Sequence, residues 1–242
     1  MARKTRIGVG ESISCILPLN KSREMFQAIF FDVIGTTVKE KGNDTVMDCL
    51  GKAFSAHTGP VNVAIIKKNR GRDKIALIRE VLSYHKYSLD LTMPVYHSFE
   101  RHFEESLNDF TENEGCTEIF SYLKTRKIKI GLGTGLSERL LDKILAHLNW
   151  NRGQFDYIGS AENFESGRPA PDMIFDMIRK LNVPGGMDFL KIGDTISDIR
   201  EGKNAKVATA VLLSGSQPKS LLIKESPDHV LASLHELRSI IK

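Results

Sequence analysis

Residues 27–38 constrain the fold of this chain more than any other stretch, because they join a continuous apolar run to a single acid. Residues 28–31 are Ala, Ile, Phe and Phe, a pattern typical of a strand buried on both faces of a parallel sheet. The run ends at Asp32, and Gly35-Thr36-Thr37 follows two residues later. Open α/β sheets bind ligands at the carboxyl ends of their strands. Asp32 is therefore either a functional carboxylate or the cap of a following helix.

Residues 43–112 have a different character from the first strand. They show no strand-like alternation and predict helices over residues 45–57, 74–85 and 93–108. In the second helix Ile75, Ile78 and Leu82 recur at helical spacing, which indicates a face packed on a core. We therefore expect residues 43–112 to be a helical cap, inserted between the first strand and the rest of the chain.

From Gly115 onward, predicted helices and strands alternate. The helices cover residues 117–125, 137–148, 173–181, 197–205 and 233–241, and the strands cover residues 128–132, 157–158, 189–192, 207–213 and 228–231. This alternation predicts an α/β protein with a doubly wound parallel sheet. Its core comprises residues 25–42 and 113–242. Residues 1–24 are expected to be a disordered or non-native extension, with Met25 as the true start.

Composition argues against several function classes. The 242 residues carry a formal net charge of +4, and basic residues form a dense run only at residues 67–74, so nucleic acid is not an expected partner. No apolar run approaches the roughly 20 residues that span a bilayer, so no membrane is expected either. Cys15, Cys49 and Cys116 lack a metal-ligand spacing. We expect a reduced, cytoplasmic protein, monomeric or homodimeric, that binds a small molecule.

Reactive or polar residues follow several predicted strands. Asp32, Thr134 and Asp194 stand at strand ends, Asp198 lies four residues after Asp194, and Arg168 lies in a Pro-rich turn. Carboxylates that meet at one sheet edge repel each other unless a cation joins them, and carboxylate and carbonyl oxygens are ligands of Mg²⁺. A hydroxyl, a helix N-terminus and a fixed cation can together hold a phosphoryl group. Asp32 is then a candidate nucleophile that forms an aspartyl phosphate.

The chain resembles the haloacid dehalogenase superfamily, and within it the phosphonatase-like branch. The resemblance rests on FFDVIGTTV, IKIGLGTGL, SGRPAPDMIF and KIGDTISDIREGKNAKVATAVLLSGS, and with the helical cap it covers about residues 26–242. It implies a Rossmann-like core and a bound Mg²⁺. The implied metal site consists of Asp32, the Ile34 carbonyl and Asp194, with Asp198 orienting the metal shell or Arg168.

The same resemblance implies how the substrate would be held. Asp32 would be the nucleophile, and Arg168 would neutralise charge in the transition state. Thr134 would bind the phosphoryl oxygens. The further residues implied to contact the substrate are Gly35, Thr36, Gly71, Lys74 and Gly135.

One departure from the superfamily pattern lies two residues after the nucleophile. Most phosphatases of the superfamily have a second Asp there as general acid and base, whereas Ile34 cannot transfer a proton. Phosphonatases also lack this Asp, and a cap Lys forms a Schiff base with phosphonoacetaldehyde instead. Lys74 and Gly71 match that Lys and its Gly. A buried Lys with a lowered pKa can form an imine; otherwise Lys74 is a solvated residue of a first helical turn, or a phosphate contact.

Three further positions differ from the phosphonatases, which have Met, His and Tyr where this chain has Arg70, Leu77 and Leu136. We therefore predict a phosphonatase-like, Mg²⁺-dependent hydrolase of a small organophosphate or phosphonate, acting through phospho-Asp32. One alternative is a true phosphonoacetaldehyde hydrolase with Lys74 as the imine. The other, suggested by Ile34, is a non-catalytic regulatory protein that binds phosphate.

Overall fold

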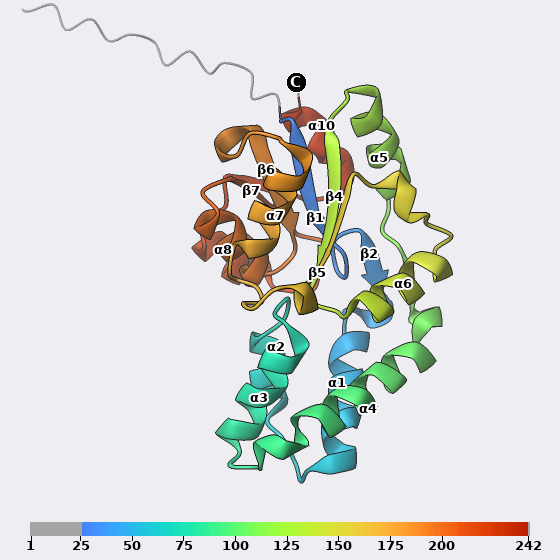
Figure 1. The fold of residues 1–242 in the computed structure, drawn as a ribbon, viewed down its shortest axis with the longest axis vertical. Helices are drawn as coiled ribbons and strands as arrows, with labels where there is room; N and C mark the ends of the chain where they lie inside the picture. The colour runs from blue at the N-terminus through green and yellow to red at the C-terminus, as the bar shows by residue number, and fades with distance from the viewer. Residues whose placement is uncertain (1–25, 242) are drawn as a thin grey trace, which may run out of the picture.

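The computed structural model describes residues 26–241. These residues form a sheet flanked by helices, and a group of four helices, α1–α4, lies beyond the carboxyl ends of its strands (Figure 1). The expected extension at residues 1–24, the proposed start at Met25 and Cys15 lie outside the described residues. None of the helices within residues 26–241 is both long and apolar enough to cross a bilayer.

The predicted parallel sheet is confirmed. Its strand order is β5-β4-β1-β6-β7-β8, and every neighbouring pair is parallel. The strands are β1 (Ala28–Asp32), β4 (Lys129–Thr134), β5 (Tyr157–Ser160), β6 (Phe189–Gly193), β7 (Ala208–Leu212) and β8 (His229–Leu231). The chain builds the sheet to one side of β1 and then to the other, so the carboxyl ends of β1, β4 and β6 meet at a topological switch point.

Helices cover both faces of the sheet, as the alternation along β1 requires. Ile29 and Phe31 pack in the larger apolar core, with α5 and α6, whereas Ala28 and Phe30 pack in a second core with α7. The helices of this unit are α5 (Cys116–Thr125), α6 (Glu138–His147), α7 (Asp172–Leu181), α8 (Ile196–Asn204), α9 (Lys219–Lys224) and α10 (Leu237–Ile240). Both faces of β1 are thus buried, as its unbroken apolar run predicts.

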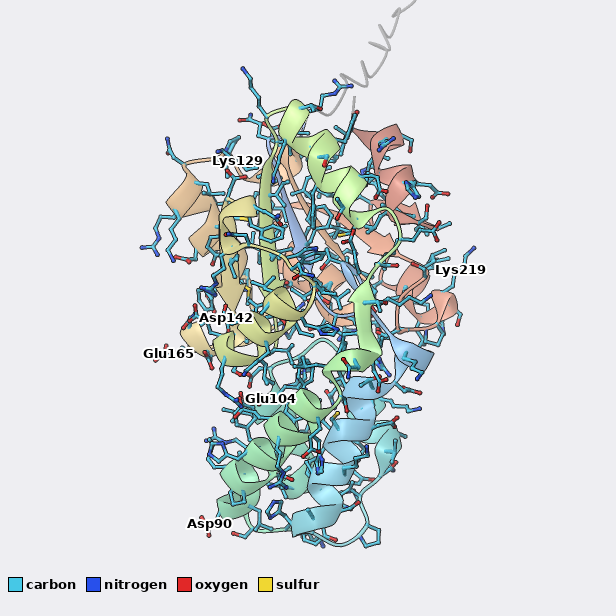
Figure 2. The ribbon with its side chains drawn as sticks, turned by 90° about the vertical axis from the view of Figure 1, so that its right-hand side faces the viewer. Asp90, Glu104, Lys129, Asp142, Glu165 and Lys219 are labelled. Atoms are coloured by element: carbon cyan, nitrogen blue, oxygen red, sulfur yellow. The ribbon has the colours of Figure 1, made fainter. Side chains whose placement is uncertain are left out.

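The four helices beyond the sheet are α1 (Thr45–His57), α2 (Val63–Lys68), α3 (Lys74–Tyr84) and α4 (Thr92–Glu105). The α3 helix begins at Lys74 because the Asp73 side chain accepts a hydrogen bond from the Ala76 N–H at 2.7 Å. Figure 2 shows Asp90 at the end of this group far from the sheet, whereas Glu104 of α4 forms an ion pair with Arg139 of α6. The four helices therefore project from the side of the sheet at which the parallel strands have their carboxyl ends.

Several short elements differ from the sequence prediction. The segment expected to be helical throughout ends in β3 (Phe110–Glu112), which pairs antiparallel with β2 (Val38–Glu40). Helices α2 and α9 were missed, and the last expected helix is a 3₁₀ turn (Leu234–Glu236) followed by α10. Pieces of three to six residues are too short to establish a period. The division into a core and a cap at residues 43–112 stays a prediction.

A lysine lies inside the sheet, where apolar side chains are the rule. Lys191 of β6 is 1% exposed, and its ammonium lies 4.9 Å from the centre of the Phe30 ring. Its Nζ lies 2.9 Å from Asp198 Oδ1 and 3.3 Å from Glu201 Oε2, both carried by α8. Asp198 also pairs with Arg168. Among the described residues, the salt bridge of Glu201 is with Lys191. Burial raises the pKa of Glu201, and Lys191 opposes this rise.

We predict that Lys191→Met lowers the free energy of unfolding by about 3–5 kcal/mol, because it leaves Glu201 buried without its cation. The double variant Lys191→Met/Glu201→Leu removes both charges at similar volume and should lose less than half as much. Urea denaturation measures both values. Equal losses in the two variants would contradict the assignment of this stability to the ion pair.

Candidate active site

A cavity lies at the carboxyl ends of the central strands, beneath the loop that joins α2 to α3. It combines acids, bases, hydroxyls and apolar side chains from segments far apart in the sequence. Its lining residues are Asp32, Ile34, Glu40, Val46, Met47, Arg70, Gly71, Lys74, Thr134, Gly135, Leu136, Arg168, Thr195 and Ser216.

Asp32 ends β1 and is 3% exposed. Its Oδ1 accepts a hydrogen bond of 2.7 Å from Arg168 Nη1, whereas no residue within 26–241 donates one to its Oδ2. Burial raises the pKa of the Asp32 carboxyl, and the guanidinium of Arg168 opposes this rise. One carboxylate oxygen is thus oriented by a cation while the other can meet a ligand.

Arg168 is held between two carboxylates. The same Nη1 that contacts Asp32 lies 2.6 Å from Asp198 Oδ1. Burial alone would lower the pKa of Arg168, but Asp32 and Asp198 raise it above its ordinary value. Asp198 is fixed in turn, because its carboxylate accepts the Thr195 N–H at 3.1 Å in a capping box at the start of α8. The guanidinium is therefore pre-positioned and permanently charged.

Asp194 directly follows β6 and is fully buried. Its Oδ1 accepts the Thr36 hydroxyl at 3.1 Å, and its Oδ2 accepts the Ser216 N–H at 2.7 Å and the Ser216 hydroxyl. Burial raises the pKa of Asp194 to about 7, and the charges of Asp32 and Asp198 contribute. A Cβ on Gly35, which has a φ of +95°, would lie 2.3 Å from an Asp194 oxygen, so no other residue fits there.

The acids at this edge form a set that a divalent cation fits. Oxygens of Asp32, Asp194 and Asp198 all lie within 4.8 Å of one another. The repulsion that raises the pKa of Asp194 is the repulsion that a bound cation would remove. Hard oxygen donors of this kind suit Mg²⁺. Ile34, whose carbonyl was expected to join them, lines the adjoining cavity.

The loop before α3 touches the sheet unit through glycines. A Cβ on Gly71, which has a φ of +79°, would lie 2.3 Å from the Thr195 hydroxyl. A Cβ on Gly135 would lie 2.6 Å from the Arg72 carbonyl oxygen. Side chains at these positions would hold the two units apart, so the glycines permit the helical group to close over the cavity.

Lys74 is 6% exposed, and its Nζ donates a hydrogen bond of 3.1 Å to the Arg72 carbonyl. Burial, aided by the charge of Arg168, lowers the pKa of its ammonium to about 8. Lys74 is therefore not the solvated helix residue that was one reading of the sequence. Its imine role and its phosphate-contact role stay predictions.

Most residues singled out in the sequence gather at this cavity. Those that line it are Asp32, Ile34, Gly71, Lys74, Thr134, Gly135 and Arg168. Asp194 and Asp198 lie in the carboxylate cluster beside it. Gly35 and Thr36 do not line it, since the Thr36 hydroxyl binds Asp194 instead, and their contact with substrate stays a prediction.

Sequence reasoning missed four residues of this region. Glu40 and Arg70 line the cavity and form an ion pair of 3.4 Å, yet each lies in a polar run with no periodic signal. Ser216 binds Asp194 from the loop after β7, where a hydroxyl beyond a strand end was a usable signal. Lys191 was detectable as a charge inside the apolar run 189–192.

Comparison with known proteins agrees with this geometry. The sequence profile of the family described as "Haloacid dehalogenase-like hydrolase" matches residues 29–212. A phosphonoacetaldehyde hydrolase of Bacteroides fragilis is 30% identical over 213 residues, which cover 83% of this chain and 81% of that protein. A phosphonoacetaldehyde hydrolase of Bacillus cytotoxicus is 27% identical over 230 residues, covering 89% and 86%.

Solved structures show the same fold at lower sequence identity. A hydrolase from Pseudomonas syringae has a TM-score of 0.80 at 18% identity, covering 89% of this chain and all of that one. A phosphonoacetaldehyde hydrolase-like protein from Oleispira antarctica has a TM-score of 0.79 at 19% identity, covering 90% and 92%. With the family profile matched across the sheet and the cavity, the chain belongs to the haloacid dehalogenase-like hydrolases.

Proposed function

We propose that the protein is a Mg²⁺-dependent hydrolase that transfers the phosphoryl group of a small organophosphate or phosphonate to Asp32. The observation that carries the proposal is the Asp32 carboxylate at the cavity wall, with one oxygen bound to Arg168 and the other free of hydrogen bonds from the described residues. In this reaction Oδ2 attacks phosphorus and the leaving group departs. Water then hydrolyses the aspartyl phosphate.

The residues around Asp32 fit the charge of the group transferred. Thr134 and Gly135 lie at the end of β4, beside the start of α6, and supply a hydroxyl and backbone N–H groups for phosphoryl oxygens. Arg168 is oriented by Asp32 and Asp198 before any substrate arrives, so it stabilises developing charge without reorganising. Lys74, the first residue of α3, adds a second cation to the cavity wall.

A Mg²⁺ ion would be held by Asp32 and Asp194, with Asp198 and the Ile34 carbonyl nearby. When bound, the ion supplies positive charge to the nucleophile and the phosphoryl oxygens. Thr36 and Ser216 hold the Asp194 carboxylate by hydrogen bonds, which orient it toward the other acids.

A second candidate function is hydrolysis of phosphonoacetaldehyde through an imine at Lys74. It is favoured by the burial of Lys74 on the cavity wall and by relatives named phosphonoacetaldehyde hydrolase. A neutral amine is needed to attack the aldehyde, and the lowered pKa of Lys74 provides one near neutral pH. Arg70, Leu77 and Leu136 differ from the phosphonatase pattern and favour another substrate.

We expect Asp32→Asn to lower kcat by about 10⁴-fold or more, because an amide oxygen does not form the covalent intermediate. Phosphate release from a panel of phosphomonoesters, with Mg²⁺ present, measures the effect. Asp142→Asn is the matched control, since Asp142 is exposed on α6 and away from the cavity. Undiminished turnover by Asp32→Asn would rule out phospho-Asp32.

Metal dependence gives a separate prediction. A chelator should abolish phosphate release, and added Mg²⁺ should restore it. Asp194→Asn removes one carboxylate from the cluster while keeping an oxygen for the Ser216 N–H, so the half-saturating Mg²⁺ concentration should rise by about tenfold or more. Full activity after chelation would contradict the metal site.

Imine formation at Lys74 would have a characteristic pH dependence. Only the neutral amine attacks the aldehyde, so inactivation by borohydride in the presence of phosphonoacetaldehyde should increase as pH rises through about 8 and then level off. Peptide mass spectrometry would find the adduct on Lys74. Lys219, exposed at the start of α9, is the internal control and should stay unmodified. A Lys74 free of label at every pH would dismiss the imine.

A further inference from the structure

The reaction proposed above leaves one proton without a donor. An alkoxide leaving group is a strong base and needs a proton as its bond to phosphorus breaks. The position that supplies this proton in most phosphatases of the resembled superfamily is Ile34, which lines the cavity with a hydrocarbon side chain. Another residue of the cavity wall must therefore exchange the proton if the substrate is an alkyl phosphate.

Few described side chains that line the cavity can do this. Its charged side chains are Asp32, Glu40, Arg70, Lys74 and Arg168. A guanidinium does not lose its proton in proteins, which removes the two arginines. Asp32 is the nucleophile of the proposed reaction. Glu40 and Lys74 remain as candidate proton donors.

Glu40 is placed firmly on the wall of the cavity. It is the last residue of β2, the strand that leaves the nucleophile loop, and it is 2% exposed. Its Oε1 accepts the Val46 N–H at 2.7 Å, and its Oε2 accepts Arg70 Nη1 at 3.4 Å. Each oxygen keeps a second lone pair, so neither contact prevents proton exchange.

The surroundings of Glu40 also suit an acid. Burial raises the pKa of its carboxyl, and this effect outweighs the Val46 N–H and the charges of Arg70 and Lys74, which lower it. The positive charges of Arg70 and Lys74 lower the pKa of Glu40, and the negative charge of Glu40 raises the pKa of Lys74 in return. A carboxyl whose pKa moves toward neutrality transfers protons more effectively near pH 7.

We propose that Glu40 is the general acid and base of this active site and that the substrate is a phosphate monoester of an alcohol; this inference rests on the proposed phospho-Asp32 chemistry. As Asp32 attacks phosphorus, the P–O bond breaks, and the leaving oxygen takes its electron pair and the Glu40 proton. Water then attacks phosphorus, and the Glu40 carboxylate takes a proton from it. The bond to Asp32 breaks, and phosphate, the Asp32 carboxylate and protonated Glu40 are restored.

The test compares Glu40→Gln with Asp44→Asn. Both replace an acid that pairs with Arg70, but Asp44 is only half-buried and does not line the cavity. Gln keeps an oxygen for the Val46 N–H, so the start of α1 retains its contact. The substrates are glycerol 3-phosphate, whose alkoxide needs a proton, and 4-nitrophenyl phosphate, whose phenolate leaves without one.

With 4-nitrophenyl phosphate, Glu40→Gln should release one equivalent of nitrophenol per site in a rapid burst, within about tenfold of the unsubstituted rate. Steady turnover should then be about 10²–10⁴-fold slower, because the water lacks a base. With glycerol 3-phosphate the variant should show no burst and a similar loss of turnover. Asp44→Asn should stay within about tenfold of the unsubstituted protein on both substrates.

Four results would overturn the inference. Equal losses by Glu40→Gln on both substrates, without a burst, would mean that Glu40 only holds Arg70 and α1. A burst in Lys74→Met but not in Glu40→Gln would make Lys74 the acid. Failure of the unsubstituted protein to hydrolyse either phosphate with Mg²⁺ would exclude this substrate class. An inactive Asp32→Asn with an unaltered Glu40→Gln would refute this inference alone, whereas an active Asp32→Asn would refute the proposed function.

Discussion

The site depends on a balance of charge beneath the ends of β1 and β6. Asp198 Oδ1 lies within 2.9 Å of both Arg168 Nη1 and Lys191 Nζ, so one buried oxygen ties together a cation at the cavity and a cation inside the sheet. Charges removed from water are retained only when partners surround them. The orientation of Arg168 toward Asp32 thus depends on a lysine that contacts no ligand.

The strand order of the sheet brings these groups together. β1 lies between β4 and β6, so Asp32, Thr134 and Asp194 reach one edge of the sheet although they are spread over more than half of the chain. The helical group then covers that edge, and the glycines at positions 71 and 135 allow backbone contact across the boundary. A nucleophile enclosed in this way faces preoriented dipoles and charges rather than bulk water.

Sequence patterns predicted the parts of the molecule in which burial recurs at regular spacing. The apolar run before Asp32 and the alternation after Gly115 predicted a parallel sheet, and Asp32 and Thr134 at its strand ends do line the cavity. Glu40 and Arg70 meet only through tertiary contact over 30 positions, and no local pattern marks them. Lys191 was missed although it is a charge inside an apolar strand, and its acidic partners lie on another element, which the pattern of one strand does not contain.

The antiparallel pair of β2 and β3 is where the chain passes between the sheet and the helical group in both directions. A ribbon of two strands bends and twists more readily than a six-stranded sheet, so it is the natural pivot for any swing of α1–α4. Glu40 sits on this pivot, at its register position opposite Phe110. Because a hinge moves least at its pivot, Glu40 would stay beside the cavity while residues of the helical group farther from the ribbon, such as Lys74, moved away from Asp32.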